Sequence, residues 1–476
     1  MKWWKSSYFF LITGLVLAFS FYLLAPASFD EPARRAVATG IVMVIWWVSE
    51  ALPMPVVALV PLVAFPLLGI QKTDAVAASY ANPAIYLFFG GFMLGLAIEK
   101  WNLHKRIALN IIHTTGTSGN RIVLGFILAT GFLSMWLSNT ATTMMMYPIA
   151  MSVISVMDHQ NHQGNNRNFA LTLMLAIAYA SNFGGIATII GTPPNVAYAG
   201  YFLERYGQEL DFFKWFLSCA PITVLMLIAL YWVMVRWLFP NNIQASTAAA
   251  SYVASEKSAL GKPGVSEQRV MVVFILTASL WIFRSLINDL QSWVKLDDTV
   301  IAIMAAIALF VVPSEKKGHA LLDWQDTHKM AWGILLLFGG GIALADGLEN
   351  TGLIQKTGNW LATFGQNTAM LVLLVIVFSL FIGEFMSNIA QVIVFAPLVS
   401  AMADSLHLSP VLLGIPMTLA ASCAGMMPMA TPPNAIVFAS GHIRFKDMVL
   451  TGFVLNIIAI VLIMIFSWFV LPFIWL

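Results

Sequence analysis

The chain has 476 residues, of which 59% are hydrophobic and 10% are charged. Soluble domains carry about 25% charged residues, so this composition excludes a soluble globular protein and indicates the lipid bilayer as the solvent. The long unbroken apolar runs exclude an outer-membrane barrel, whose strands alternate apolar and polar residues. The net charge of +2 indicates no nucleic-acid partner. We therefore expect an all-α polytopic membrane protein.

The predicted spans follow from the length of the apolar runs, because one crossing needs about 20 apolar residues. The first run follows a basic start and has no clear small-residue cleavage site, which indicates a retained span and not a removed signal peptide. In chain order the sequence predicts single spans over 8–25, 36–52, 53–70, 84–100, 168–203, 213–238, 268–288, 298–313, 331–349, 409–440 and 447–474.

Two further apolar regions, 121–157 and 367–404, are too long for one crossing, and a Ser-Asn pair interrupts each near its middle. Each region forms either two spans or a re-entrant hairpin that enters and leaves the membrane on one side. Hydropathy does not distinguish these alternatives. Both add an even number of crossings, so the predicted topology of the remaining chain is the same.

A polar stretch divides the chain into two halves of similar plan. Residues 241–267 are rich in serine and alanine, with turn-forming residues, and predict a flexible linker outside the membrane. Lys2 and Lys5 place the N-terminus in the cytoplasm by the positive-inside rule, and six spans later the linker lies on the cytoplasmic side too. The expected parts are an N-terminal span and loop over 1–35, a first half over 36–240 and a second half over 268–476.

The two halves share three short motifs in the same order. Leaving out the first span, each half holds five crossings, so equivalent segments face opposite sides of the membrane. This is the inverted-repeat plan of secondary transporters. The motifs are a glycine pair (90–91 and 339–340), Ser-Asn (138–139 and 387–388) and Thr-Pro-Pro-Asn (192–195 and 431–434).

Each Thr-Pro-Pro-Asn motif predicts a break within a membrane helix. The residue before a proline is pushed toward extended backbone, and proline suits the first position of a helix. We expect one half-helix to end before Thr192 and the next to begin at Pro193, and the same at Thr431 and Pro432. The freed carbonyls suit a hard cation such as Na+, and the amides at a helix N-terminus suit an anion. The broken helices are those predicted over 168–203 and 409–440.

The Ser-Asn pairs supply similar chemistry without a fixed charge. We expect Ser138 or Asn139 to end one helix and Thr140 to cap the next, with Ser387 and Asn388 doing the same in the second half. The four interruptions then meet near the midplane around one cavity. No lysine or arginine lies beside any of them in the sequence, so bound Na+ and helix dipoles would neutralise a doubly charged anion.

Glu384 is a further candidate, because a carboxylate inside the membrane is a functional residue by default. Its counterpart in the first half is Met135, so it is not part of the symmetric set, and it either braces the second Ser-Asn region or titrates. Single serine and asparagine residues within spans more often join helices than bind ligands, but the ordered duplication favours a site. The sequence contains no HExxH, P-loop or GxSxG pattern, so we predict neither an enzyme nor an organic cofactor.

These motifs resemble those of the divalent anion/sodium symporter family, the INDY-type carboxylate transporters. The resemblance runs from WWVSEALP to the last span and is carried by SNTAT at 138–142, both Thr-Pro-Pro-Asn motifs and ATPPNAIVFASGHI at 430–443. It implies eleven spans with two re-entrant hairpins, and a homodimer in which a transport part moves like an elevator against a scaffold. It also implies uptake of succinate, malate or fumarate, or of citrate in some branches and more rarely sulfate, across a bacterial inner membrane.

The resemblance also implies the residues of the site. The first sodium ion would be held by Ser134, Ser138, Asn139 and Gly191. The second would be held near Gly383, Met386, Asn388 and Ala430, partly by main-chain carbonyls. The anion would contact Ser138, Asn139, Thr140, Thr192, Pro193, Ser387, Asn388, Thr431 and Pro432.

Two positions depart from the family pattern. Ile389 stands where the second motif usually has threonine, so the substrate side of the cavity lacks a hydroxyl. Gly383 stands where sodium-coupled members often have threonine, which weakens the expected second sodium site. The leading hypothesis is a sodium-coupled C4-dicarboxylate symporter. The alternative is a sodium-independent di- or tricarboxylate exchanger, or a citrate or sulfate transporter, of the same family.

Overall fold

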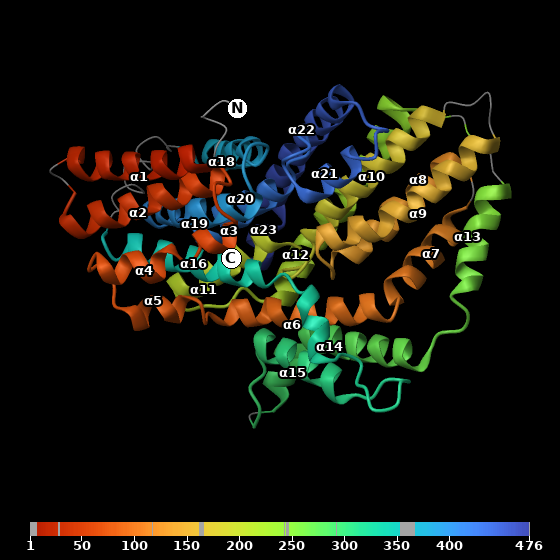
Figure 1. The fold of residues 1–476 in the computed structure, drawn as a ribbon, viewed down its shortest axis with the longest axis horizontal. Helices are drawn as coiled ribbons and strands as arrows, with labels where there is room; N and C mark the ends of the chain where they lie inside the picture. The colour runs from red at the N-terminus through yellow and green to blue at the C-terminus, as the bar shows by residue number, and fades with distance from the viewer. Residues whose placement is uncertain are drawn as a thin grey trace.

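A computed structural model describes residues 7–26, 29–116, 118–160, 166–241, 243, 247–291, 293–352 and 367–475. Within these residues the regular structure is helical and includes no β-strand, as the composition predicts. Helices α1 (Ser7–Leu24) and α2 (Glu31–Val48) lie side by side at one end of the molecule, and α13 (Thr247–Ala259) lies at the other (Figure 1).

The helices of the two halves follow one another in a similar order. The first half continues with α3 (Met54–Val57), α4 (Val60–Leu67), α5 (Thr73–Ser79), α6 (Pro83–Lys100), α7 (Leu103–Thr115), α8 (Gly119–Ser134), α9 (Asn139–Gln160), α10 (Asn166–Gly185), α11 (Pro193–Tyr206), α12 (Phe212–Trp232) and the π-helical turn η2 (Val233–Leu238). After α13 come α14 (Val265–Leu290), α15 (Asp298–Val311), the 3-10 turn η3 (Trp324–Lys329), α16 (Trp332–Glu349), α18 (Thr368–Ile382), α19 (Asn388–Ser405), α20 (Pro410–Ser422), α21 (Pro432–Phe438), α22 (Phe445–Phe469) and α23 (Leu471–Trp475).

Several helices begin where a short polar side chain caps the free amides of the first turn. Asn82 accepts a hydrogen bond from the Ala84 amide over 3.0 Å, and Pro83 follows it as the first residue of α6. Asp211 caps α12 by accepting from the Lys214 amide over 2.8 Å. These starts are local properties of the sequence, which is why their positions agree with the predicted spans.

Eight helices among the described residues are long and apolar enough to cross a membrane. The other predicted spans consist of shorter or interrupted helices. The span predicted over 53–70 divides into α3 and α4, because Pro61 has no N–H to donate to the Val57 carbonyl. Large apolar side chains such as Leu67, Leu290 and Phe473 are exposed on the outside of the protein, as expected for surfaces that face lipid. The fold is therefore that of an all-α polytopic membrane protein.

The prediction of a flexible linker over 241–267 is wrong for residues 247–259, which form α13. This segment is rich in alanine, the strongest helix former, and buries Val253. Helix α13 packs against α7 and α9, and Arg106 of α7 donates a hydrogen bond of 2.9 Å to the Gly261 carbonyl. Helix α7 itself was not predicted, because its charged residues keep it below the hydropathy of a span.

The two broken helices occupy the centre of the protein. The described side chains of α10 and α20 are buried almost all round, whereas few residues of α1 and α14 are buried. Helix α10 packs against α8 and α9, and α20 packs against α18 and α19. The polar backbone of the first break, residues 186–192, is thereby kept within protein, which is the condition for an irregular segment inside a membrane.

Candidate functional site

The first helix break has the geometry that its sequence predicts. Helix α10 ends at Gly185 and α11 begins at Pro193, with Thr192 in extended backbone at φ −141°. The Asn195 side chain donates to the Thr188 carbonyl over 2.8 Å and to the Gly185 carbonyl over 3.3 Å. The asparagine of the motif thus holds the non-helical segment in place, a role that the sequence does not predict.

The second break repeats this arrangement. Helix α20 ends at Ser422 and α21 begins at Pro432, with Thr431 at φ −141°. The Asn434 side chain donates to the Met427 carbonyl over 3.1 Å, in the role that Asn195 has in the first break. This break is more open than the first, since Pro432 is exposed whereas Pro193 is half-buried.

The first Ser-Asn pair lies in a turn between α8 and α9, and it contacts the first break. Asn139 Nδ2 donates to Thr192 Oγ1 over 3.4 Å, and Asn139 Oδ1 lies 2.7 Å from the buried Ser134 hydroxyl. The Ser134 hydroxyl also lies 2.7 Å from the Ser181 carbonyl of α10. Three residues of the predicted site are thus joined in one hydrogen-bonded chain.

The cap of α9 is Ser138 and not Thr140. Ser138 Oγ accepts from the Ala141 amide over 3.3 Å, whereas Thr140 lies half-buried in the first helical turn. A cap bonds to the second or third amide of its helix, and Thr140 is already inside the helix, so it has no free amide in reach. Thr140 therefore takes no part in the cap of α9.

Main-chain carbonyls converge beside Gly191. A Cβ atom on this residue would stand 2.5 Å from the Gly185 oxygen and 3.0 Å from the oxygens of Ser134 and Met135. A larger residue would collide with main-chain atoms, which cannot easily move, so the position requires glycine. Carbonyl oxygens and neutral side-chain oxygens form the ligand shell that hard cations prefer. The arrangement fits Na+, which needs no histidine, cysteine or carboxylate ligand.

The second Ser-Asn pair lies between α18 and α19 and is less closely tied to its break. Ser387 precedes α19 but its side chain does not cap the helix. Asn388 Oδ1 is buried and has no hydrogen-bond partner among the described residues. Met386 is half-buried and Ala430 is buried. The described contacts include no hydrogen bond that joins these residues to Thr431.

The two halves are interlocked through the short helices that follow the breaks. Helix α21 packs against α9 and α10, and α11 packs against α19 and α20. Asn182 of α10 reaches across to the second break, where its amide nitrogen lies 3.1 Å from Thr431 Oγ1 and 3.4 Å from Asn434 Oδ1. Sequence reasoning missed Asn182, because nothing in its local motif distinguishes it from a polar residue that joins helices.

Glu384 braces the second break. Its buried carboxylate accepts hydrogen bonds of 2.9 to 3.0 Å from the amides of Gly425, Met426 and Met427, and one of 2.8 Å from Asn456 Nδ2. The counterpart of Glu384 in the first half is Met135. There the main-chain carbonyl of Met135, and not a carboxylate, bonds to the break, because it accepts a hydrogen bond from the Thr188 hydroxyl. This geometry favours the bracing role over the titrating one.

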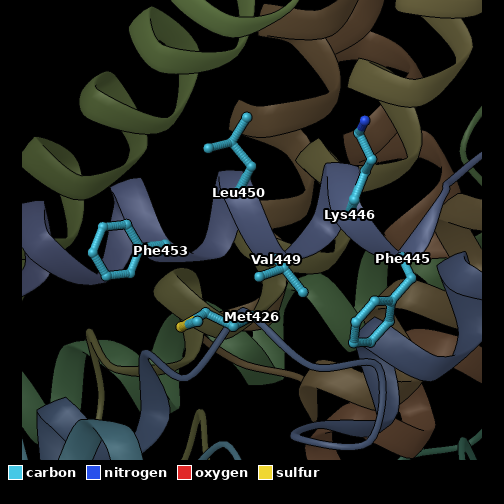
Figure 2. A pocket seen from close by; sticks show the side chains of 6 residues that line it. All are labelled: Met426, Phe445, Lys446, Val449, Leu450 and Phe453. Carbon is cyan, nitrogen blue, oxygen red and sulfur yellow. The ribbon is translucent and has the colours of Figure 1, made fainter.

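One cation lies nearer the second break than the sequence indicates. Lys446 lines a pocket of about 340 Å³ together with Met426, which belongs to the break. The other lining side chains are apolar, and the Lys446 ammonium points away from Met426 (Figure 2). This pocket therefore lacks the polar groups that an anion needs, and it does not supply a positive charge that would neutralise a bound anion.

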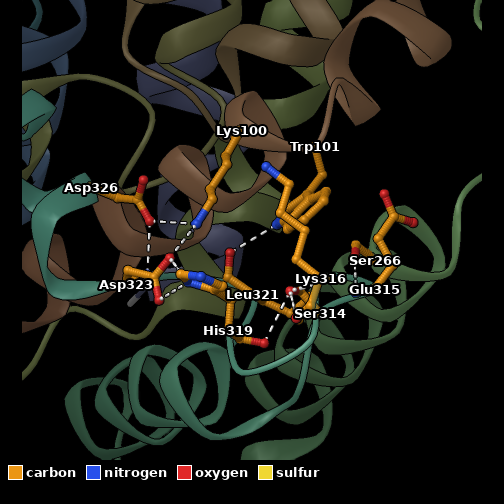
Figure 3. Close-up of polar contacts among 10 residues, drawn as sticks. All are labelled: Lys100, Trp101, Ser266, Ser314, Glu315, Lys316, His319, Leu321, Asp323 and Asp326. Carbon is orange, nitrogen blue, oxygen red and sulfur yellow. Dashed lines mark hydrogen bonds and ion pairs between the residues drawn. The ribbon is translucent and has the colours of Figure 1, made fainter.

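A charged cluster elsewhere clamps the loop between α15 and α16. Lys100 of α6 pairs with Asp326 over 2.7 Å and with Asp323 over 3.2 Å, and the Trp101 indole donates to the Leu321 carbonyl (Figure 3). Slight burial acts to raise the pKa of Asp323, but hydrogen bonds from Lys100 and His319 outweigh it and lower that pKa. These charges are paired with one another between α6 and the loop, so the cluster is structural.

Comparisons with known proteins show the family to which the chain belongs. Over residues 1–476 the chain matches the family described as the sodium:sulfate symporter transmembrane region. It is 37% identical over 475 residues to the sodium-dependent dicarboxylate transporter SdcS of Staphylococcus saprophyticus, covering 97% of this chain and 91% of that protein. It is 36% identical over 477 residues to SdcS of Staphylococcus aureus, with the same coverage.

Two solved structures share the fold at low sequence identity. The YdaH transporter of Alcanivorax borkumensis superposes with a TM-score of 0.60 at 13% identity, covering 94% of this chain and 99% of that one. MtrF of Neisseria gonorrhoeae superposes with a TM-score of 0.57 at 11% identity, covering 97% and 93%. At these identities the likeness concerns the fold alone.

Proposed function

Because the chain belongs to the sodium:sulfate symporter family, whose members are membrane transporters and not enzymes, we propose that it couples the uptake of a C4-dicarboxylate to the entry of Na+. The substrate class rests on the names of the two staphylococcal relatives, both sodium-dependent dicarboxylate transporters. Succinate, malate and fumarate are the anions of this class that we expect it to carry.

The convergence of main-chain oxygens beside Gly191 is the observation that carries the proposal. The carbonyls of Ser134, Met135 and Gly185 crowd around it, with Asn139 Oδ1 next to Gly185. Ser134, Ser138, Asn139 and Gly191 form the proposed first sodium site. The Gly185 and Met135 carbonyls already accept hydrogen bonds from Asn195 and Thr188, and each keeps a second lone pair that a Na+ ion among these oxygens would use.

Asn139 is the proposed link between cation and anion. Its oxygen faces Ser134 on the cation side, and its amide nitrogen faces Thr192, where α11 begins. An amide has acceptor and donor groups at opposite ends, so Na+ drawn to the oxygen leaves the N–H groups directed at a carboxylate. Bound Na+ then orients the donor and neutralises part of the charge of the anion.

The proposed anion site draws on neutral groups from both halves. The N-termini of α9, α11 and α19 add their positive dipole ends, since no lysine or arginine is adjacent in the sequence. The contacting residues are Ser138, Asn139, Thr140, Thr192, Pro193, Ser387, Asn388, Thr431 and Pro432.

The interlocking of α11 and α21 with the opposite half supports a transport part that moves as one body. We extend the proposal to an elevator movement of this part against a scaffold, in a homodimer in the bacterial inner membrane with a cytoplasmic N-terminus. The two halves, 36–240 and 268–476, form the proposed inverted repeat. The proposed re-entrant hairpins are 121–157 and 367–404.

One observation favours a second candidate function, sodium-independent exchange of di- or tricarboxylates. Ile389 in the first turn of α19 has no hydroxyl where the first half has Thr140, and Gly383 has none where the first half has Ser134. Fewer oxygen ligands in the second half would weaken its hold on Na+.

Uptake of labelled succinate into proteoliposomes separates the two functions. A symporter accumulates succinate in empty vesicles under an inward Na+ gradient and stops when choline replaces Na+. Uptake that continues without Na+, but needs anion loaded inside, would overturn the symport proposal and support exchange.

A further inference from the structure

The internal repeat shows a paired exchange of residues beside the second Ser-Asn motif. At the same offset of 249 positions that relates residues 138 and 387, Ser134 corresponds to Gly383 and Thr142 to Gln391. The second half has therefore lost a hydroxyl at one position and gained a longer amide side chain at the other. Gly383 is the C-cap residue of α18, and Gln391 lies one turn into α19.

Hydrogen bonds fix the orientation of the Gln391 amide. Its nitrogen lies 2.6 Å from the Ser379 carbonyl and 2.6 Å from the Ser379 hydroxyl, which itself donates to the Met417 carbonyl over 2.7 Å. Both Ser379 oxygens therefore accept from Gln391, and only the amide nitrogen can donate to them. The opposite orientation would set the amide oxygen against a carbonyl, so Oε1 must point away from Ser379.

The Gln391 oxygen points at the space that the missing hydroxyl leaves. Oε1 lies 3.0 Å from the point where a Cβ on Gly383 would stand, and the Ala421 carbonyl of α20 lies 3.3 Å from that point. Gln391 is fully buried, and Oε1 has no hydrogen-bond partner among the described residues. Asn388 Oδ1, from the same turn, is also buried without a described partner. Buried acceptors without a donor lower stability unless a ligand satisfies them.

The chemistry of this group points to a cation. An amide oxygen and a main-chain carbonyl offer lone pairs and no proton, and buried polar oxygens of this kind suit a hard ion. A longer side chain at residue 391 reaches the same place that a hydroxyl at residue 383 would occupy. We propose that Gln391 Oε1 replaces that hydroxyl as a ligand of a second co-transported Na+, with Asn388 Oδ1 as a neighbouring ligand. The inference rests on the proposed sodium coupling and adds a residue that lies outside the Ser-Asn motif.

The test compares Gln391→Met, which keeps the length and loses the oxygen, with wild-type protein in proteoliposomes. We expect the Na+ concentration for half-maximal succinate uptake to rise about tenfold or more, as for the loss of one ligand to a charged group. The steepness of the Na+ dependence of uptake should also fall, because only one site then binds Na+ at the concentrations tested. Ser134→Ala is the matched variant at the first site.

A second readout needs no transport. Thermal unfolding in detergent, measured in rising NaCl against choline chloride, reports Na+ binding through the increase in Tm. We expect Gln391→Met to lose part of the Na+-dependent increase. A role in packing alone would lower Tm equally in both salts and would overturn the inference.

The double variant Gly383→Ser/Gln391→Thr copies the pair Ser134 and Thr142 into the second half and decides the case if Gln391→Met does not fold. Regained Na+ dependence in the double variant supports the inference, whereas a folded double variant with weak Na+ binding overturns it.

The outcomes also separate this inference from the proposed sodium coupling. Wild-type uptake that is independent of Na+ overturns the sodium coupling and this inference with it. Wild-type uptake that needs Na+, with Gln391→Met unchanged, overturns this inference alone.

Discussion

Asn182 donates a hydrogen bond of 3.1 Å to the hydroxyl of Thr431, so that α10 of the first half holds the helix break of the second. Both residues are buried, and Thr431 Oγ1 also accepts from the Asn434 amide over 3.4 Å. Thr192 and Thr431 are related by an offset of 239 positions, and at that offset Asn182 corresponds to Ala421, whose methyl side chain cannot donate a reciprocal bond to the first break. The two breaks thus share one backbone plan but differ in what supports them.

We predict that Asn182→Ala uncouples the second break from α10. The initial rate of succinate uptake should fall about tenfold, the effect of roughly 1.4 kcal/mol on one step of transport. Asn350→Ala, which changes an exposed asparagine at the end of α16, is the matched control and should transport at the wild-type rate. A rate equal to that control in Asn182→Ala would show that the Thr431 contact is dispensable.

Asn139→Ala should abolish uptake. The change removes the oxygen that faces Ser134 and the nitrogen that donates to Thr192, so both the cation and the anion lose a contact. The measurement is labelled succinate uptake in proteoliposomes under a saturating Na+ gradient, with Asn350→Ala again as the control. Unchanged kinetics in Asn139→Ala would mean that the site lies elsewhere.

Gly191→Ala should block Na+ binding. The added methyl group would meet three main-chain oxygens, the nearest at 2.5 Å. Overpacking of this kind costs about 1–3 kcal/mol, and here it also fills the space between the proposed ligands. Gly95→Ala is the control, because the atom nearest its methyl group is the end of a leucine side chain at 3.1 Å. A Na+-dependent increase in Tm that is as large in Gly191→Ala as in Gly95→Ala would contradict the predicted site.

Glu384→Gln should destabilise the protein without changing the pH dependence of uptake. The neutral amide replaces one carboxylate oxygen by a donor that faces main-chain N–H groups, at an expected cost of about 2–3 kcal/mol. Thermal unfolding in detergent measures the effect, and Glu256→Gln on the exposed face of α13 is the control. If uptake in Glu384→Gln instead loses its dependence on pH while Tm is unchanged, the carboxylate titrates during transport and is not a brace.

The sequence was sufficient where structure depends on neighbouring residues. Pro193 and Pro432 lack an N–H, so the helix breaks at Thr192 and Thr431 could be located without knowledge of the fold. The predictions failed where local propensity and hydropathy gave conflicting signals. The polar residues of α13 predict a flexible linker, although alanine favours a helix and α7 and α9 provide a surface to pack against.

The sequence by itself determined the class of protein, the two helix breaks and the repeat that relates them, because these follow from composition, proline geometry and spacing. Only the tertiary structure decided which oxygen atoms face one another. Asn182 and Thr431 lie 249 positions apart. The direction of Gln391 Oε1 is set by Ser379, on the preceding helix. Such contacts depend on how buried helices pack, and a residue's type alone does not indicate which neighbour its side chain meets.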